Sequence, residues 1–204
     1  MIIGYIFRSG DHWGPAAEKI VHDPEENHSS TFVMRECFGT ENGGKYGTIK
    51  SKIVKEFRRA IAFLRLHSSP GNLLTEARMR SWRIYGILTD LVQKYLNDAP
   101  LIIQKLRNSQ IQYETDCNYR SKKIQNDSVI TVHTRDQPYT GIWTLFRPYV
   151  NDDDDLEVIL DAHHVGHQIS NLALVTGDWN HIASQKTIII SNSRIANILF
   201  LGHC

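Results

Sequence analysis

One strand-like segment near the carboxyl end of the chain constrains the fold most. Residues 172–176 are apolar and β-branched, as expected of a central parallel strand that is covered on both faces. Gly177 then permits a sharp turn, and Asp178 follows at the carboxyl end of the strand. In open α/β sheets, ligands bind at that edge. The segment therefore predicts a parallel α/β fold with a ligand site at Asp178.

Strand-like and helix-like segments alternate along the chain, which predicts a three-layer α/β/α domain with a mainly parallel central sheet. The expected strands are 129–134, 172–176 and 187–190. The expected flanking helices are 15–21 and 152–169. Segments 2–7, 30–34 and 195–201 fit either a strand or a helix, and a Gly-rich break is expected at 42–44. Segment 136–149 contains Pro138, Gly141 and Pro148, so we expect a loop there.

The middle of the chain is both helical and basic. Apolar residues recur at helical spacing from Ile49 to Leu64, and further helices are expected at about 73–96 and 100–112. Between Lys45 and Gln125 there are sixteen Lys and Arg against six Asp and Glu, a net charge of +10, which leaves −9 on the remainder. We therefore expect a basic helical insertion at 45–125 between two parts of one α/β domain, 1–44 and 126–204.

This charge asymmetry indicates a polyanionic partner such as RNA, which the basic segment would bring towards an acidic site. The alternative is an ordinary solvated helical surface. The candidate RNA-binding residues are Arg58, Arg59, Arg78, Arg80, Arg83, Lys122 and Lys123. Tyr119 is available for base stacking, whereas Trp82 and Tyr85, three positions apart, are better explained as helix-core residues.

Cysteine use and hydropathy narrow the class of protein. Cys37, Cys117 and Cys204 are scattered and form no CxxC pair, which argues against a disulfide framework. No signal peptide follows Met1, and no apolar run approaches the length of about 20 residues that spans a membrane. We therefore expect a cytoplasmic protein without membrane contact.

Several of these segments together resemble a known family. Residues 155–162, 172–178 and 186–198 look like the carboxyl half of a PIN domain, and residues 16–21 continue the resemblance. Residues 32–36, which end at Glu36, are similar to the second acidic motif of the family. The resemblance covers about half of the chain and leaves out the basic middle. PIN domains are metal-dependent nucleases that mostly cut RNA, and they include the toxins of prokaryotic toxin–antitoxin pairs.

The chain departs from the family at its beginning. The family opens with a strand that ends in an Asp, usually followed by Ser or Thr and then Asn, and this chain has no such triplet. In one register, residues 8–10 occupy the triplet, which places Arg8 where the first metal-binding Asp belongs. In the other register, which we favour, residues 1–7 correspond to the following helix and the first strand is missing from the sequence.

The resemblance implies a carboxylate site for Mg²⁺ or Mn²⁺ that activates water against a phosphodiester bond. Its expected metal ligands and catalytic residues are Glu36, Asp155, Asp161 and Asp178. Asp155 and Asp161 are six residues apart, about 600° around a helix, so they do not share a face. The interpretation requires that Glu36, Asp161 and Asp178 approach a common cation.

Each acidic residue also has a structural explanation. Residues 152–155 would cap a helix, an interpretation that we prefer for Asp152 and Asp153. Asp178 would be a turn residue after a strand. Asp161 lies in an apolar helical stretch, where a carboxylate is costly unless it is paired or metal-bound.

Histidines offer a competing zinc interpretation. His163 and His167 have the i, i+4 spacing that brings two imidazoles to one metal. His164 and His181 lie nearby in sequence, but no HExxH pattern and no evident third ligand accompany them. We therefore favour solvated or RNA-facing histidines.

Three functions remain open at this point. The preferred one is a metal-dependent ribonuclease. The second is a catalytically degenerate relative that binds RNA or a protein partner, because one expected carboxylate is missing. The third is a doubly wound nucleotide-binding or phosphate-binding domain, which the absence of a glycine-rich phosphate loop weakens. A cognate protein inhibitor and a homodimer are further partners to test.

Overall fold

The structure is a computed structural model that describes residues 2–7, 14–22, 26–39, 44–96, 98–126 and 129–203. Over these residues the chain is mixed α/β and mostly helical. The helices are α1 (Ile2–Ile6), α2 (Gly14–Val21), α3 (Thr31–Phe38), α4 (Gly44–His67), α5 (Pro70–Met79), α6 (Tyr85–Lys94), α7 (Ala99–Asn126), α8 (Thr140–Phe146), α9 (Asp153–Gly166) and α10 (Lys186–Asn192). The strands are β1 (Asn27–Ser30), β2 (Ile130–His133), β3 (Ala173–Thr176) and β4 (Asn197–Phe200). Two short 3-10 helices are η1 (Ala183–Gln185) and η2 (Leu201–His203).

The strands form two parallel pairs. β1 pairs with β2, with Asn27 opposite Ile130, and β3 pairs with β4, with Ala173 opposite Asn197. The described residues therefore contain two separate two-stranded sheets in place of the single central sheet that was expected. The alternation of strands and helices did predict the mixed α/β class and the parallel direction of the strands. The expected triplet position at 8–10 and residues 42–43 of the Gly-rich break lie outside the described residues.

Two local predictions are wrong. Residues 187–190 are β-branched but lie in α10, where Ile189 is fully buried in a cluster with residues of α8, α9 and β4. Tertiary packing therefore overrides the local strand preference. Segment 136–149, expected as a loop, contains α8, whose Phe146 is fully buried in the same cluster.

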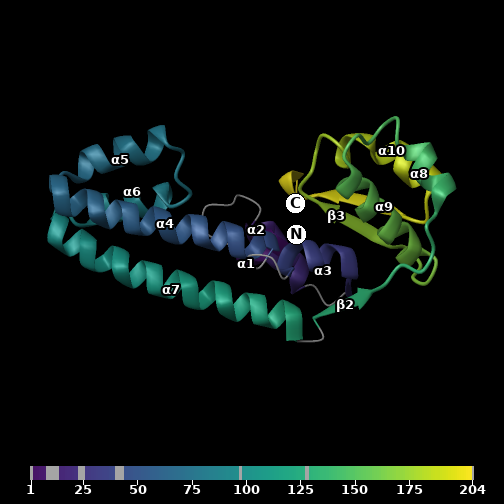
Figure 1. The fold of residues 1–204 in the computed structure, drawn as a ribbon, viewed down its shortest axis with the longest axis horizontal. Helices are drawn as coiled ribbons and strands as arrows, with labels where there is room; N and C mark the ends of the chain where they lie inside the picture. Colours follow the sequence, from purple (N-terminus) through teal and green to yellow (C-terminus); the bar gives the residue numbers. More distant parts are fainter. Residues whose placement is uncertain are drawn as a thin grey trace.

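The basic middle of the chain forms a long helical arm, which we define as α4 to α7 (residues 44–126). Figure 1 shows α4 and α7 side by side along the long axis of the molecule, with α5 and α6 beside their far ends. The expected helix at 73–96 is broken between Met79 and Tyr85. Trp82, only 7% exposed, enters the core at this break, next to Ser81 with a φ of 50°.

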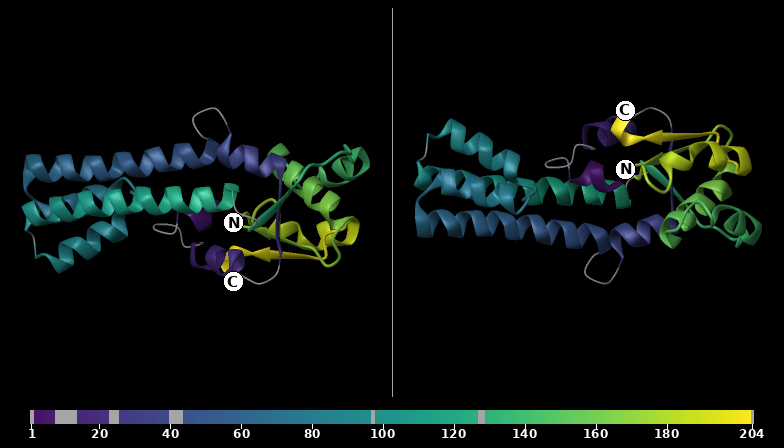
Figure 2. Two further views of the ribbon diagram at one scale, coloured as in Figure 1. Left: turned by 90° about the horizontal axis from the view of Figure 1, so that it is seen from below. Right: turned by 90° about the horizontal axis from the view of Figure 1, so that it is seen from above.

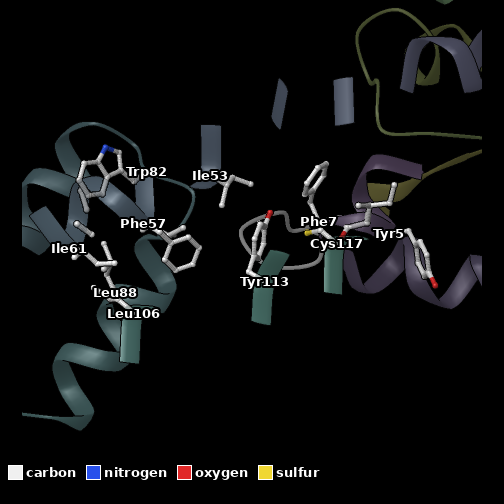
Figure 3. Packing of buried hydrophobic residues seen from close by; sticks show 14 of the residues in the cluster. Tyr5, Phe7, Ile53, Phe57, Ile61, Trp82, Leu88, Leu106, Tyr113 and Cys117 are labelled. Atoms are coloured by element: carbon white, nitrogen blue, oxygen red, sulfur yellow. Dashed lines mark hydrogen bonds between the residues drawn. The ribbon is translucent and has the colours of Figure 1, made fainter. Parts of the chain in front are cut away.

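The buried hydrophobic residues form two clusters. The larger cluster runs through the arm to α1, and Figure 3 shows Phe57, Tyr113 and Phe7 following one another along it. The smaller cluster lies within residues 129–203, which we call the carboxyl region, and includes Phe146 and Ile198. The two parts of the molecule therefore have largely separate interiors.

The carboxyl ends of β3 and β4 face the base of the arm. Both views in Figure 2 place the C-terminus, which follows β4, in the middle of the molecule near the N-terminal helices. η2 contacts α2, α2 contacts α1, and α1 contacts α7 of the arm. Because β3 is parallel to β4, the turn that carries Asp178 emerges at the same end.

None of the described helices is long and apolar enough to cross a membrane.

Candidate metal centre

Three side chains meet at the carboxyl end of β3. Asp155 comes from the first turn of α9, and Asp178 and His181 come from the turn that follows β3. Each offers one ligand atom, and these atoms all lie within 4.8 Å of one another. In the part of the chain that the structure describes, this is the one group of three or more such side chains that meets this distance. Its size fits a single cation.

Backbone hydrogen bonds fix the turn after β3. The amide of Asp178 donates to Thr176 Oγ1 over 2.9 Å, and Thr176 is only 7% exposed. The amide of His181 donates to Asp178 Oδ1 over 2.8 Å. Asp178 Oδ2 then lies 3.6 Å from His181 Nδ1. One carboxylate oxygen of Asp178 therefore holds the turn while the other faces the site.

The start of α9 positions Asp155. The Asp152 side chain accepts hydrogen bonds from the amides of Asp154 and Asp155 at 2.9 and 3.2 Å, which confirms the prediction that Asp152 caps this helix. Asp153 faces outward and pairs with Arg147 over 2.8 Å. Because Asp152 satisfies these amides, the Asp155 carboxylate is available to the site. Its Oδ2 lies 2.8 Å from His181 Nδ1.

The site favours a positive charge between its carboxylates. Burial raises the pKa of Asp155, and the nearby charge of Asp178 raises it further, while the hydrogen bond from His181 opposes both. The hydrogen bond to Asp155 is the largest cause of the raised pKa of His181. A proton on His181 thus compensates the two carboxylates. A metal ion would compensate them in the same way.

The donor set fits a divalent metal ion. Two carboxylates suit Mg²⁺ and Mn²⁺, whereas an imidazole nitrogen is typical of transition metals. The combination therefore favours Mn²⁺ over Mg²⁺. Because His181 Nδ1 now binds Asp155, it becomes a ligand only when it loses its proton and that hydrogen bond.

Two of the four expected ligands, Glu36 and Asp161, do not join this group. Glu36, in α3, forms an ion pair with Lys45. Asp161, in α9, pairs with Arg135 Nε over 2.7 Å, and Arg135 also pairs with Glu157. Asp161 lies about 9 Å further along α9 than Asp155 and on a different face. Of the two explanations for a buried Asp161, pairing is therefore the one that the structure shows.

The histidines at the carboxyl end of α9 and directly after it are arranged as hydrogen-bonding groups. His163 Nδ1 accepts from the amide of Arg194 over 3.1 Å, so a neutral His163 carries its proton on Nε2. That nitrogen lies 3.2 Å from His167 Nε2, and the ring of Tyr139 stacks on His167. A hydrogen bond between the two rings therefore explains the short distance between the Nε2 atoms of His163 and His167. The zinc interpretation gains no third ligand from the described residues.

A basic groove runs along α4. It has a volume of about 770 Å³, and its lining includes Arg59 and Arg80 of the predicted RNA-binding residues, together with Lys52 and Lys55, which were not predicted. The other predicted residues lie outside this lining, and four of them are exposed, namely Arg58, Arg78, Arg83 and Lys122. Lys123 is half-buried. The sequence thus indicated the basic surface but not which cations share a groove.

Comparisons of the chain with models of protein families, with curated proteins and with solved structures found no match.

Proposed function

We propose that this protein is a metal-dependent ribonuclease, with a PIN-like domain whose Asp155, Asp178 and His181 hold Mn²⁺ or Mg²⁺. The observation that carries the proposal is the approach of these three ligand atoms at the carboxyl end of a parallel strand. That edge is where α/β folds bind ligands. The ligand set differs from the one expected, since His181 replaces Glu36 and Asp161.

A bound divalent cation would lower the pKa of a coordinated water and offset the charge that develops on phosphorus. Asp155 and Asp178 would hold the cation from two different segments, α9 and the turn after β3. Thr176 holds the Asp178 turn through its hydroxyl. When no cation is present, His181 holds a proton against Asp155 at Nδ1. Proton and metal therefore compete for this position.

Fold and charge also support this proposal. β3 and β4 are parallel and connected through α10, and two of the three candidate ligands, Asp178 and His181, follow β3. The basic arm supplies the attraction for a polyanion that an RNA-cutting site requires. The small number of cysteines, of which Cys37 and Cys117 are free thiols, supports a cytoplasmic location. A cognate inhibitor and a homodimer stay predictions.

A second candidate is an RNA-binding relative without activity. The observation that favours it is the pairing of two expected ligands with cations of the protein itself, Glu36 with Lys45 and Asp161 with Arg135. These ion pairs engage two carboxylates that would otherwise be available to bind a metal ion.

Cleavage of an unstructured RNA with Mn²⁺ separates the two candidates. Wild type is compared with Asp178→Asn and with Asp153→Asn, a matched change at an outward-facing carboxylate. For a nuclease, Asp178→Asn loses more than the roughly 10–100-fold that a missing supporting partner costs a metal site, while Asp153→Asn keeps wild-type activity. Salt-sensitive RNA binding without cleavage by wild type supports the second candidate.

A further inference from the structure

Four of the cations of α4 form one continuous stripe. At about 100° per residue, Lys45, Lys52, Lys55 and Arg59 fall within about 80° of one another around the helix, together with Thr48. Thr48, Lys52, Lys55 and Arg59 line the groove. The buried residues Ile53, Phe57 and Leu64 occupy a different face, which packs into the core. The stripe is therefore a distinct polar face of α4.

The other wall of the groove is the turn between α5 and α6. Arg80 and Trp82 contribute to it, and Glu56 lies at its base, 3% exposed. Glu56 Oε2 accepts hydrogen bonds from the amides of Arg83 and Ile84, at 2.8 and 3.4 Å, and so ties the turn to α4. The lining holds one carboxylate, Glu56, against the four cations Lys52, Lys55, Arg59 and Arg80, so its net charge is positive.

The groove cations are available for a ligand. Lys52, Lys55 and Arg59 are exposed and form no ion pair with another described residue, whereas Arg80 pairs with Glu76. The one aromatic ring in the lining, Trp82, is 7% exposed and belongs to the core. A protein partner usually needs an apolar anchor pocket. Cations without such a pocket favour a phosphate backbone instead.

The stripe leads to the candidate metal centre. Lys45, at its near end, forms an ion pair with Glu36, and the charge of Asp154 acts on Lys45. Asp154 is the neighbour of Asp155 in the first turn of α9. The groove then continues along α4 from Gly47 to Arg59. From Lys45 to Arg59 the stripe extends about 21 Å, which matches about six stacked nucleotides.

We infer that the α4 groove binds the phosphate backbone of a single RNA strand and directs it towards Asp155 and Asp178. The inference deepens the proposed function and rests on its RNA substrate. Lys52, Lys55 and Arg59 contact successive phosphates, and Arg80 contacts the strand from the opposite wall. Arg58, at about 100° from Arg59 around α4, takes no part.

The test is RNA binding without metal, measured by fluorescence anisotropy with a labelled oligouridylate of about twelve nucleotides and EDTA, over about 0.05–0.3 M KCl. The variants are Lys52→Gln/Arg59→Gln and the matched pair Arg58→Gln/Arg65→Gln. Arg58 and Arg65 are also exposed cations of α4, but they lie about 100° and 120° from the centre of the stripe around the helix. Thermal unfolding of each variant checks that these surface changes leave the fold intact.

Loss of two phosphate contacts should reduce the slope of log affinity against log salt by about 1.4, while the matched pair keeps the wild-type slope. Affinity of the groove variant should fall on the order of tenfold at low salt. Equal slopes for both variants overturn the inference. So does a groove variant that keeps its RNA affinity but loses binding of a polyglutamate peptide, because an acidic protein would then be the occupant.

The experiments distinguish a failure of the groove inference from a failure of the nuclease proposal. Asp178→Asn should bind RNA in EDTA with wild-type affinity and slope, since Asp178 is not part of the groove. If wild type never cleaves RNA but the groove variant shows the reduced slope, the nuclease proposal fails and the groove stands. If wild type cleaves and the groove variant binds normally, the groove fails and the nuclease proposal stands.

Discussion

The helical arm and the carboxyl region differ in what they bury. The arm encloses an almost entirely apolar interior, with Glu56 and Ser121 as its buried polar residues among those described. The carboxyl region, which has a similar number of residues, buries Asp161, His163, His164 and Thr176. A buried polar group is tolerated only when it is paired, so the carboxyl region depends on specific partners where the arm depends on packing. The candidate chemistry lies in the region that carries this polar interior.

The largest effect should follow from removing Arg135 in the carboxyl region. Arg135→Met leaves Asp161 and Glu157 without their shared cation, and Asp161 is only 5% exposed. Breaking a buried ion pair costs about 3–5 kcal/mol, because the remaining charge has no compensation. Urea unfolding measures the loss of stability.

The control for this change is Arg147→Met, which breaks the exposed pair with Asp153. Exposed pairs contribute about 0–1 kcal/mol, so this variant should unfold nearly as wild type does. Similar losses of stability in both variants would show that the buried Arg135 pair contributes no more than an exposed pair. The contrast between the two regions would then not hold.

In the arm, stability should depend instead on the volume of the buried side chains. Leu106 of α7 is fully buried in the larger cluster, so Leu106→Ala should cost about 2–5 kcal/mol through lost burial and a residual cavity. Leu66 of α4 is 80% exposed, so Leu66→Ala should stay within about 0.5 kcal/mol. Urea unfolding of both variants tests this, and an unaffected Leu106→Ala would mean that the arm is not held by its core.

A smaller effect is expected at the start of α9. Asp152→Ala removes the cap on the amides of Asp154 and Asp155 and should cost about 1 kcal/mol. Because the same turn places Asp155, the variant should also bind Mn²⁺ more weakly. Asp153→Ala, whose side chain points outward, is the control for both measurements. Unchanged Mn²⁺ binding in Asp152→Ala would mean that the cap does not position Asp155.

Acid should loosen the carboxyl region before the arm. Burial lowers the pKa of His163, whose neutral ring accepts from the Arg194 amide. In the unfolded chain the pKa of His163 is about 6.5. Below that pH the unfolded chain binds a proton that the folded chain still excludes, so the free energy of unfolding falls as the pH falls. Hydrogen exchange at about pH 7.5 and 5.5, corrected for intrinsic rates, should show lost protection in α9 but not in α4.

His163→Gln, which cannot titrate and keeps an acceptor for the Arg194 amide, should lose less protection in α9 on acidification. Equal acid sensitivity of α4 and α9 in the wild type would contradict the assignment of this effect to the buried histidine.

The sequence predicted those features that local chemistry controls. The apolar run at 172–176 became β3, although in a two-stranded sheet with Ala173 exposed and not as a central strand covered on both faces. Asp178 follows it at the candidate site, and Asp152 became a helix cap. The apolar spacing from Ile49 to Leu64 correctly predicted a helix. In each case the signal lies in neighbouring residues of the sequence.

Features that depend on distant partners were missed. Nothing near Asp161 or Glu36 in sequence reveals that Arg135 and Lys45 would pair with them. His181 was not predicted as a ligand of this site, although its spacing three residues after Asp178 allows its amide to bond with that carboxylate and its ring to turn to the same site. Helix α10 formed from β-branched residues because Ile189 completes a core.

The most direct test of the metal centre is Mn²⁺ binding by isothermal titration calorimetry, with three proteins compared under identical conditions. Wild type and Glu36→Gln should each bind one Mn²⁺ with similar affinity, because Glu36 pairs with Lys45 outside the site. Asp178→Asn should lose that binding. Binding retained in Asp178→Asn, or lost in Glu36→Gln, would contradict a metal centre made of Asp155, Asp178 and His181.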